Sequence, residues 1–174
     1  MPAGKERQKI AVGDAVVYSS HGIGRVVARE QRTIDGTKRE YVVIDLAADL
    51  RVALPLDEAD DRLRPVLDAA SYKRVQKTLA AEPTARDGSW TRRIKESNAK
   101  LAGGDALELA ELVRDGARYE GAGAGSRLSA GERRIYLQAR QLLVREICAA
   151  RGLEEAAAEK WIEAQVAPPK ENGD

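Results

Sequence analysis

The sequence is short of the residue types on which several classes of protein depend. It contains one cysteine, Cys148, and one histidine, His21, which excludes an internal disulfide and a His/Cys metal cluster. No apolar run approaches the ~18 to 20 residues of a membrane-spanning helix, and the N-terminus does not resemble a signal peptide. We therefore expect no metal, no cofactor, no membrane partner and a location in a reducing cytoplasm.

Aromatic residues are also scarce, because the 174 residues include no Phe, five Tyr and two Trp. The content of hydrophobic residues, 43%, and of charged residues, 33%, is typical of a globular protein rather than a disordered one. The core must be built from Val, Leu, Ile and Ala. Each Trp consequently requires an explanation.

Up to about residue 67 the pattern is one of short β-branched runs separated by turn residues. The predicted strands are 15–18, 25–34, 38–46, 50–54 and, more weakly, 62–67. Asp35-Gly36 lies between two of them and is typical of a two-residue hairpin turn, since both residues tolerate positive φ. Five short strands in this length predict a small, curled, barrel-like sheet.

From Asp68 onward the periodicity is helical. Asp68, Ser89 and Asp105 are candidate N-caps, and Ser129 with Glu132 forms a capping-box pattern. About five helices are predicted, at 68–81, 89–101, from 105, 129–151 and 154–166. The prediction is an α+β protein with a barrel domain at 10–67, an all-α bundle at 68–167, and disordered ends at 1–9 and 168–174. We expect it to be a monomer.

The residues do not favour catalysis. Ser97 and Lys100 match a Ser-x-x-Lys pattern, but they lie within a predicted helix and lack companion motifs. His21 lies at a glycine-flanked corner, where exposure to solvent or a role in turn packing is expected, and Cys148 lies among apolar residues. We therefore predict that the protein is not an enzyme.

Charge is segregated although the net charge is only +1. Residues 71–100 contain eight basic and three acidic residues, and residues 127–145 contain five Arg against Glu132 alone. Such segments are candidate contacts to a phosphate backbone, although charge alone favours a solvated helix face. Trp90 favours the first interpretation, because an aromatic ring at a helix start beside Arg and Lys can wedge against a base step. The alternative is a core role, since Trp90, Ile94 and Leu101 share a helical face.

Several segments together resemble the CarD/CdnL family of bacterial transcription regulators. They are Val12-Gly13-Asp14 with Val16-Val17-Tyr18, Gly22-Ile23-Gly24, Trp90-Thr91-Arg92-Arg93, 109–115 and 128–134. The resemblance implies a Tudor-like barrel that binds the β subunit of RNA polymerase. It further implies a helical domain that contacts promoter DNA in the minor groove at the upstream edge of the bubble, with little sequence specificity. Such a protein stabilises the open complex without catalysis.

Carried over residue by residue, the resemblance implies two sets of contacts. The DNA-binding set is Trp90, Arg92, Arg93, Lys95, Arg133 and Arg134. The polymerase-binding set is Arg32, Thr33, Ile34, Leu50, Arg51, Val52, Ala53, Leu54 and Pro55. Ala53 stands where members of the family can carry an Arg, so Arg51 or Arg32 is expected to serve instead. Gly116-Ala117, together with the glycine-rich loop that follows it, is expected to interrupt a region that is normally continuous.

A different class of protein is compatible with the same residues. A protein–protein adaptor, with a Tudor-like barrel and no DNA contact, would explain the near-zero net charge and the acidic last helix. Salt dependence separates the two hypotheses, because contact with DNA through several cations predicts binding that weakens steeply as salt rises.

Overall fold

The chain folds into two compact units that divide between Val66 and Leu67. The computed structural model describes residues 10–47, 49–121 and 127–166. Within these ranges it contains five strands, with a 3-10 turn and one short helix among them, followed by five longer helices, which confirms the predicted α+β class. The ends predicted to be disordered, 1–9 and 168–174, lie outside the described residues.

The first unit is a small antiparallel sheet in the order β4-β3-β2-β1-β5. Its strands are β1 (Ala15–Tyr18), β2 (Gly22–Ile34), β3 (Thr37–Leu46), β4 (Arg51–Pro55) and β5 (Leu63–Pro65). A 3-10 turn, η1 (Ser19–His21), connects β1 to β2. Helix α1 (Leu56–Arg62) contacts β3 and both edge strands, β4 and β5. The five-stranded, Tudor-like architecture is the one that the strand pattern and the resemblance predict.

Alternate residues of β3 build the core of this unit. Val42, Ile44 and Leu46 are buried on one face of the sheet, together with Val26 and Leu54 of the neighbouring strands. Gly24 of β2 lies against this face, and a Cβ atom there would come within 2.5 Å of Ile44 Cγ2. The glycine therefore permits the close approach of β2 and β3 that a curled sheet requires.

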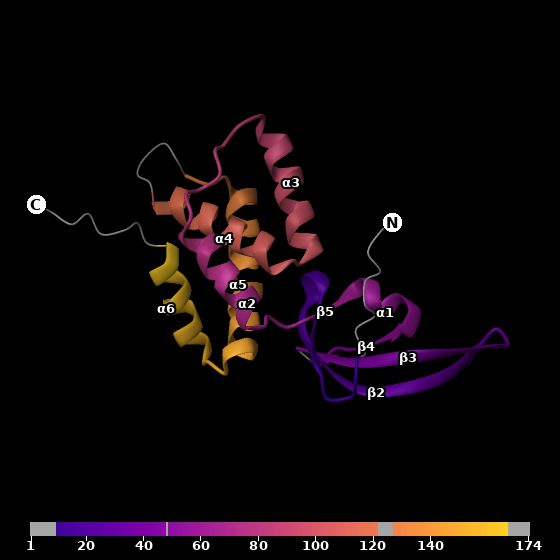
Figure 1. Cartoon of the computed structure of the whole chain (residues 1–174). Helices are drawn as coiled ribbons and strands as arrows, with labels where there is room; N and C mark the ends of the chain where they lie inside the picture. Colours follow the sequence, from indigo (N-terminus) through magenta and orange to yellow (C-terminus); the bar gives the residue numbers. More distant parts are fainter. Residues whose placement is uncertain (1–9, 48, 122–126, 167–174) are drawn as a thin grey trace, which may run out of the picture. The chain divides into compact units, whose positions relative to one another are not determined.

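The turn between β2 and β3 has the predicted two-residue form. Asp35 and Gly36 have φ values of 51° and 77°, and Ile34 pairs directly with Thr37. Because β1 pairs only with Gly22–Arg25 and β4 only with 41–45, the outer half of this hairpin is a two-stranded ribbon. Figure 1 shows the ribbon extending beyond the other strands.

Helix α1 is a correction to the sequence prediction. The pattern predicts that the fourth strand ends before Pro55 and that a fifth runs from 62 to 67, whereas β4 includes Pro55 and β5 is only three residues long. Pro55 occupies the N-cap position of α1, and Asp57 and Glu58 lie in its first turn, where they complement the helix dipole. A helix of seven residues is too short to display a helical periodicity.

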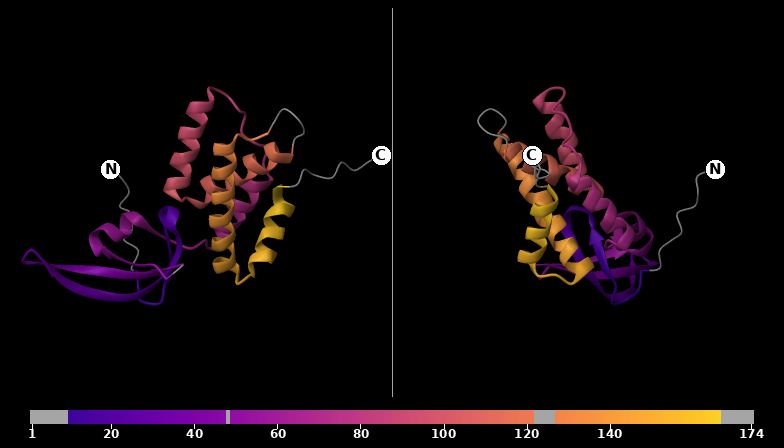
Figure 2. Two further views of the ribbon diagram at one scale, coloured as in Figure 1. Left: turned by 180° about the vertical axis from the view of Figure 1, so that it is seen from behind. Right: turned by 60° about the vertical axis from the view of Figure 1, so that its left-hand side comes forward.

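The second unit contains five helices within its described residues, as predicted. They are α2 (Ala69–Ala80), α3 (Trp90–Gly103), α4 (Ala106–Gly121), α5 (Ala130–Arg151) and α6 (Glu155–Val166). Helix α5 contacts α3, α4 and α6. Figure 2 shows it lying between α3 and α6. Helix α4 contacts all four of the other helices of this unit, so α4, rather than the longest helix, is the one against which the bundle is assembled.

Aliphatic side chains form the hydrophobic core of the bundle, and two charged side chains, Arg114 and Glu146, are buried in the same unit. Leu79, Leu109, Val113, Leu143 and Ile147 are almost completely buried, which is the core expected of a chain without Phe. The predicted caps are also present. Asp68, Ser89 and Ser129 each accept a backbone N–H bond from the first turn of the following helix, and Asp105 accepts two.

The expected interruption does not begin at Gly116, because α4 continues through this residue to Gly121, and the rest of the glycine-rich segment, 122–126, lies outside the described residues. A Cβ atom at position 116 would come within 2.3 Å of Tyr136 Cδ2 on α5. The glycine lowers helix propensity, but it allows the Tyr136 ring to lie directly against the α4 backbone. Tertiary packing thus outweighs the local preference.

Candidate functional sites

Trp90 is the first residue of α3, and its side chain is half exposed, with a relative exposure of 51%. Its indole Nε1 donates a hydrogen bond to Ser129 Oγ, 3.0 Å away, at the N-cap of α5. Ile94, one turn further along α3, lies near Gly131, where an added Cβ would be 3.4 Å from Ile94 Cδ1. Ile94 therefore faces the bundle. Trp90 lies where the first turns of α3 and α5 meet, and its side chain remains open to solvent.

Four of the predicted DNA-binding cations are exposed on α3 and α5. Arg92 makes an ion pair of 2.7 Å with Glu96, one turn along the same helix, and Arg133 lies 3.5 Å from Glu120. Lys95 and Arg134 are exposed and make no ion pair with the described residues. Surface pairs of this kind contribute little to stability, so Arg92 and Arg133 can exchange their partners for phosphates.

Arg93 is placed differently from the other cations. Its Nη1 donates to the backbone carbonyl of Gly88 over 2.9 Å, and its Nε lies 3.5 Å from Glu132 Oε1. Only a quarter of the side chain is exposed. Arg93 therefore ties the start of α3 to α5, and we expect it to support the surface around Trp90 rather than to bind a phosphate directly.

The Glu132 carboxylate accepts hydrogen bonds from two segments of the chain. Arg86 Nη2 donates to Glu132 Oε1 over 2.7 Å, and the backbone N–H of Ser129 donates to Oε2 over 2.9 Å, which completes the capping box. Burial raises the pKa of this carboxyl group, but the hydrogen bonds from Arg86 and Ser129 lower it more, and the resulting pKa is about 2. The carboxylate is therefore ionised at any physiological pH.

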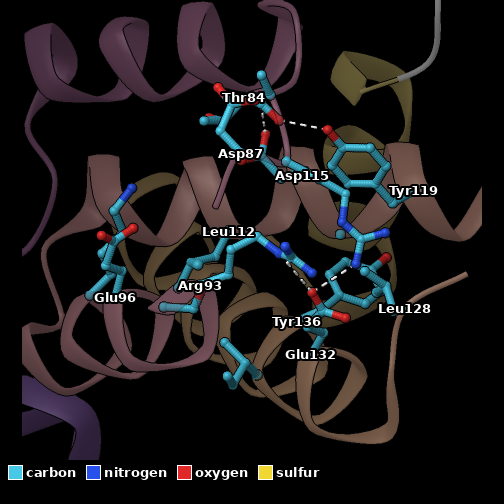
Figure 3. A pocket seen from close by; sticks show the side chains of 16 residues that line it. Thr84, Asp87, Arg93, Glu96, Leu112, Asp115, Tyr119, Leu128, Glu132 and Tyr136 are labelled. Carbon is cyan, nitrogen blue, oxygen red and sulfur yellow. Dashed lines mark hydrogen bonds and ion pairs between the residues drawn. The ribbon is translucent and has the colours of Figure 1, made fainter. Parts of the chain in front are cut away.

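The segment between α2 and α3 closes one side of a small cavity (Figure 3). Three hydrogen bonds of Thr84 hold this segment in place. The Thr84 carbonyl accepts from Tyr119 Oη (2.6 Å), and its backbone N–H donates to Asp115 (3.0 Å). Its hydroxyl accepts from Arg114 (2.8 Å). The cavity encloses about 160 Å³. That volume is below the ~300 Å³ at which small-molecule pockets begin.

None of the residues considered for catalysis in the sequence has the surroundings of a catalytic group. Lys100, which lines the cavity with Ser97, donates to Glu111 Oε2 and forms an ion pair with it. His21 stacks on Tyr18, with ring centroids 4.8 Å apart. Burial, together with Glu155 and Glu154, raises the pKa of the Cys148 thiol, which disfavours a reactive thiolate.

The described ranges contain no group of three or more His, Cys, Asp or Glu residues arranged to hold a metal ion. None of the helices in the described part of the chain has the length and hydrophobicity needed to cross a membrane.

The second candidate site is the free edge of the sheet, formed by β4. Leu46 N–H donates to the Leu50 carbonyl over 2.7 Å, so Leu50 begins the series of hydrogen-bonded pairs with β3. Because such pairs alternate along an antiparallel ladder, the backbone N–H and C=O groups of Arg51 and Ala53 point away from β3. Pro55 carries no N–H and ends the edge. These outward groups could pair with a strand of another protein.

The side chains of the predicted polymerase-binding set divide between the two faces of the sheet. Leu50, Val52 and Leu54 have the parity of the core face, and Leu54 is only 5% exposed, so it is available through its backbone alone. The opposite face carries Arg51, Ala53 and Pro55, with Arg32 and Ile34 of β2. Thr33 points to the same side as the core, at the exposed hairpin end.

Two arginines on the outer face are held by neighbours. Arg51 forms two hydrogen bonds with its cross-strand partner Asp45, and the hydrogen bond from Arg51 is the main reason that the pKa of Asp45 is lowered. Arg32 pairs with Glu30 at 2.9 Å, and its guanidinium lies over the Tyr41 ring, 5.3 Å from the centroid. Both cations therefore lie on the face where the resemblance expects an arginine at position 53.

Sequence reasoning missed the residues that support Trp90. Ser129 and Glu132 were recognisable as a capping box, but their contacts with Trp90, Arg86 and Arg93 join segments 39 to 46 residues apart. No local spacing reports such a contact. The excess of Arg around Glu132 was the only available indication.

Both units of the chain are similar to known proteins. Residues 10–67 match the family model described as "CarD-like/TRCF RID domain", and residues 74–163 match "CarD, C-terminal domain". YdeB of Bacillus subtilis (strain 168), which is named as a proposed transcription factor, is 29% identical over 146 residues, covering 83% of this chain and 94% of YdeB.

One third of the chain is also similar to a small part of two larger proteins. The transcription-repair-coupling factors of Mycobacterium bovis and Mycobacterium tuberculosis are each 36% identical over 66 residues, which is 33% of this chain and 5% of those proteins. The two family models together cover both units in the expected order. The chain belongs to the CarD-like transcription factor family.

Proposed function

We propose that this protein binds the β subunit of RNA polymerase through the β4 edge and the β2–β3 hairpin, and promoter DNA through the helical unit, so that it stabilises the open complex. The DNA contact would lie in the minor groove at the upstream edge of the bubble. The observation that carries the proposal is Trp90, a half-exposed indole at a helix start with cations on the same helix.

The surroundings of Trp90 suit a wedge at a distorted base step. An exposed aromatic face can stack on an unstacked base, while Lys95, Arg133 and Arg134 supply charge for the adjacent phosphates. No acidic residue precedes Glu96 in α3, so the first turn of the helix is free of the charge that would repel DNA. Phosphate contacts of this kind add affinity without sequence choice.

The sheet edge supports the polymerase contact. The outward backbone groups of Arg51 and Ala53 can add a strand from the partner, and Arg51 and Arg32 lie on the adjoining face. The relatedness of residues 10–67 to the CarD-like/TRCF RID model is consistent with that role. A tethered helical unit then meets DNA at a high effective concentration, so individually weak contacts suffice.

Stabilisation of the open complex requires that DNA in the open form be bound more tightly than closed duplex. Trp90 can supply this difference, because it inserts only where the bases are unstacked. An aromatic contact of ~1 to 3 kcal/mol would change the population of the open complex by roughly five- to a hundredfold.

The test is the lifetime of promoter open complexes with the matching RNA polymerase. We expect wild-type protein to lengthen the lifetime and Trp90→Ala to lose most of that effect, with unchanged binding to the isolated polymerase β lobe. Trp161→Phe is the matched control, because Trp161 stacks on Tyr72 inside the same unit, with centroids 4.7 Å apart. Equal loss of β-lobe binding in Trp90→Ala would contradict the assignment of Trp90 to DNA.

The adaptor hypothesis makes a different prediction for the same protein. If the helical unit binds DNA through four or five cations, its effect on open complexes falls steeply between 50 and 200 mM salt. An adaptor without DNA contact would show no such dependence, and no effect on lifetime together with no β-lobe binding would leave the adaptor as the better hypothesis.

A further inference from the structure

We propose that Ser129 is a positioning residue that fixes the orientation of the Trp90 indole for its contact with DNA, an inference that rests on the proposed function. Ser129 Oγ accepts the indole N–H over 3.0 Å and also accepts the backbone N–H of Glu132 over 3.3 Å. A hydroxyl oxygen has two acceptor lone pairs, so one atom can make both bonds. The oxygen that starts α5 is therefore also the oxygen that holds the indole.

Further contacts hold Ser129 itself in place. Its backbone N–H donates to Glu132, and Glu132 lies within ion-pair distance of Arg93. Arg93 in turn donates to the Gly88 carbonyl, two residues before Trp90. The contacts thus form a closed ring that joins the first turn of α3 to the first turn of α5 at two points. Rotation of the indole away from α5 would break the bond to Ser129 in this ring.

The bond to Ser129 has two consequences for DNA contact. First, a side chain that is half exposed would otherwise sample several rotamers, and ordering such a side chain on binding weakens affinity by roughly two- to tenfold. Second, the bond occupies the only hydrogen-bond donor of the indole. What remains exposed is an apolar ring, which can stack on a base but cannot select among bases by hydrogen bonding.

The experiment separates loss of the hydroxyl from loss of the helix cap. Ser129→Gly removes the acceptor, while glycine remains an acceptable N-cap residue. Ser129→Thr restores a hydroxyl at the same position. Asp68→Gly is the matched control, because Asp68 caps α2 through Ser71 N–H and does not contact Trp90. All variants carry Trp161→Phe, so that Trp90 is the only tryptophan.

Two quantities are measured on the full chain. Solvent exchange of the Trp90 indole N–H, observed by NMR, reports the bond without any partner present. The open-complex lifetime with RNA polymerase reports its consequence. In Ser129→Gly we expect the N–H to exchange several-fold faster and the lifetime to fall two- to tenfold toward that of Trp90→Ala. Ser129→Thr and Asp68→Gly should match the wild-type protein in both quantities.

Unchanged exchange in Ser129→Gly, or faster exchange with a wild-type lifetime, would overturn the positioning role. Equal effects in Asp68→Gly would also overturn it, because they would trace the loss to helix stability. A wild-type lifetime for Trp90→Ala would instead overturn the proposed function, and with it the role of Ser129 at DNA. A failure confined to Ser129→Gly overturns only the inference about Ser129.

Discussion

Glu132 illustrates how one residue serves both local and tertiary structure. Its carboxylate completes the capping box of α5, and the same group accepts from Arg86 and lies near Arg93. The pKa of about 2 lies below the ordinary value of 4.5 for glutamate, so the folded state favours the ionised form. The interaction therefore stabilises the fold fully above pH 4.5, and the stabilisation is lost as the pH falls through 2.

We predict that Glu132→Gln makes the helical unit less stable at pH 6 and less sensitive to acid. Gln keeps the capping hydrogen bond but carries no charge. From the two pKa values, the wild-type protein should lose roughly 2 kcal/mol more than the variant between pH 6 and pH 3. Urea unfolding followed by tryptophan fluorescence measures this, since both Trp residues lie in the helical unit. Equal losses in the two proteins would refute the prediction.

At the scale of elements, β4 combines a buried side and an open edge. Leu54 anchors the strand in the core, whereas the backbone N–H and C=O groups of Arg51 and Ala53 that point away from β3 meet no further strand among the described residues. Helix α1 follows directly and contacts both β4 and β5. The edge is therefore rigidly supported from one side and free on the other, which favours pairing with a partner strand.

Ala53→Pro is expected to weaken binding to the polymerase β lobe at least fivefold. The substitution removes an outward N–H, and a backbone hydrogen bond contributes about 1 kcal/mol. The sheet should unfold at nearly the wild-type temperature, because proline is tolerated at an edge when the N–H faces solvent. Val52→Pro is the contrasting variant, since its N–H points toward β3, and it should destabilise the sheet itself. Wild-type affinity in a folded Ala53→Pro protein would exclude pairing at this edge.

At the scale of the whole molecule, two units with separate cores are joined by a very short connection. Leu63 belongs to the core of the sheet unit and Leu67 packs on the core of the helical unit, so only residues 64–66 separate them. A short connection restricts the distance between two bound sites and raises the effective concentration of the second contact. Bridging between polymerase and DNA should therefore depend on this length.

Inserting ten Gly and Ser residues between Val66 and Leu67 is predicted to reduce the lengthening of open-complex lifetime by about three- to tenfold. Binding to the isolated β lobe should remain unchanged, because that contact needs the sheet unit alone. An insertion of the same length at the exposed Asp35-Gly36 turn would leave the connection between the units unchanged. It is unsuitable as a control, because it would alter the proposed polymerase contact. The β-lobe measurement on the linker variant is thus the appropriate control, and an undiminished lifetime would argue against tethering.

Local patterns in the chain were sufficient for most of the elements. The alternation in residues 38–46, the positive-φ turn at Asp35-Gly36 and the caps at Asp68 and Ser129 each depend on neighbours a few residues away, and all are present. The same is true of the aliphatic core, because the apolar faces of single helices define it. Helix α1 was not predicted, because seven residues are too few to show a helical periodicity of apolar residues.

Only the tertiary structure decided which polar side chains lie on the surface and which are held by contacts with other segments. Arg92 and Arg93 are adjacent in sequence and identical in type, yet one lies on the surface and the other is tied to Gly88 and Glu132. Gly116 is a second example, because its sequence suggests a helix break, whereas in the fold the Tyr136 ring packs against it. The sequence by itself determined the elements and the charge of each segment, because these depend on local spacing. The partner of each side chain depends on contacts between segments tens of residues apart, and only the folded bundle specifies those.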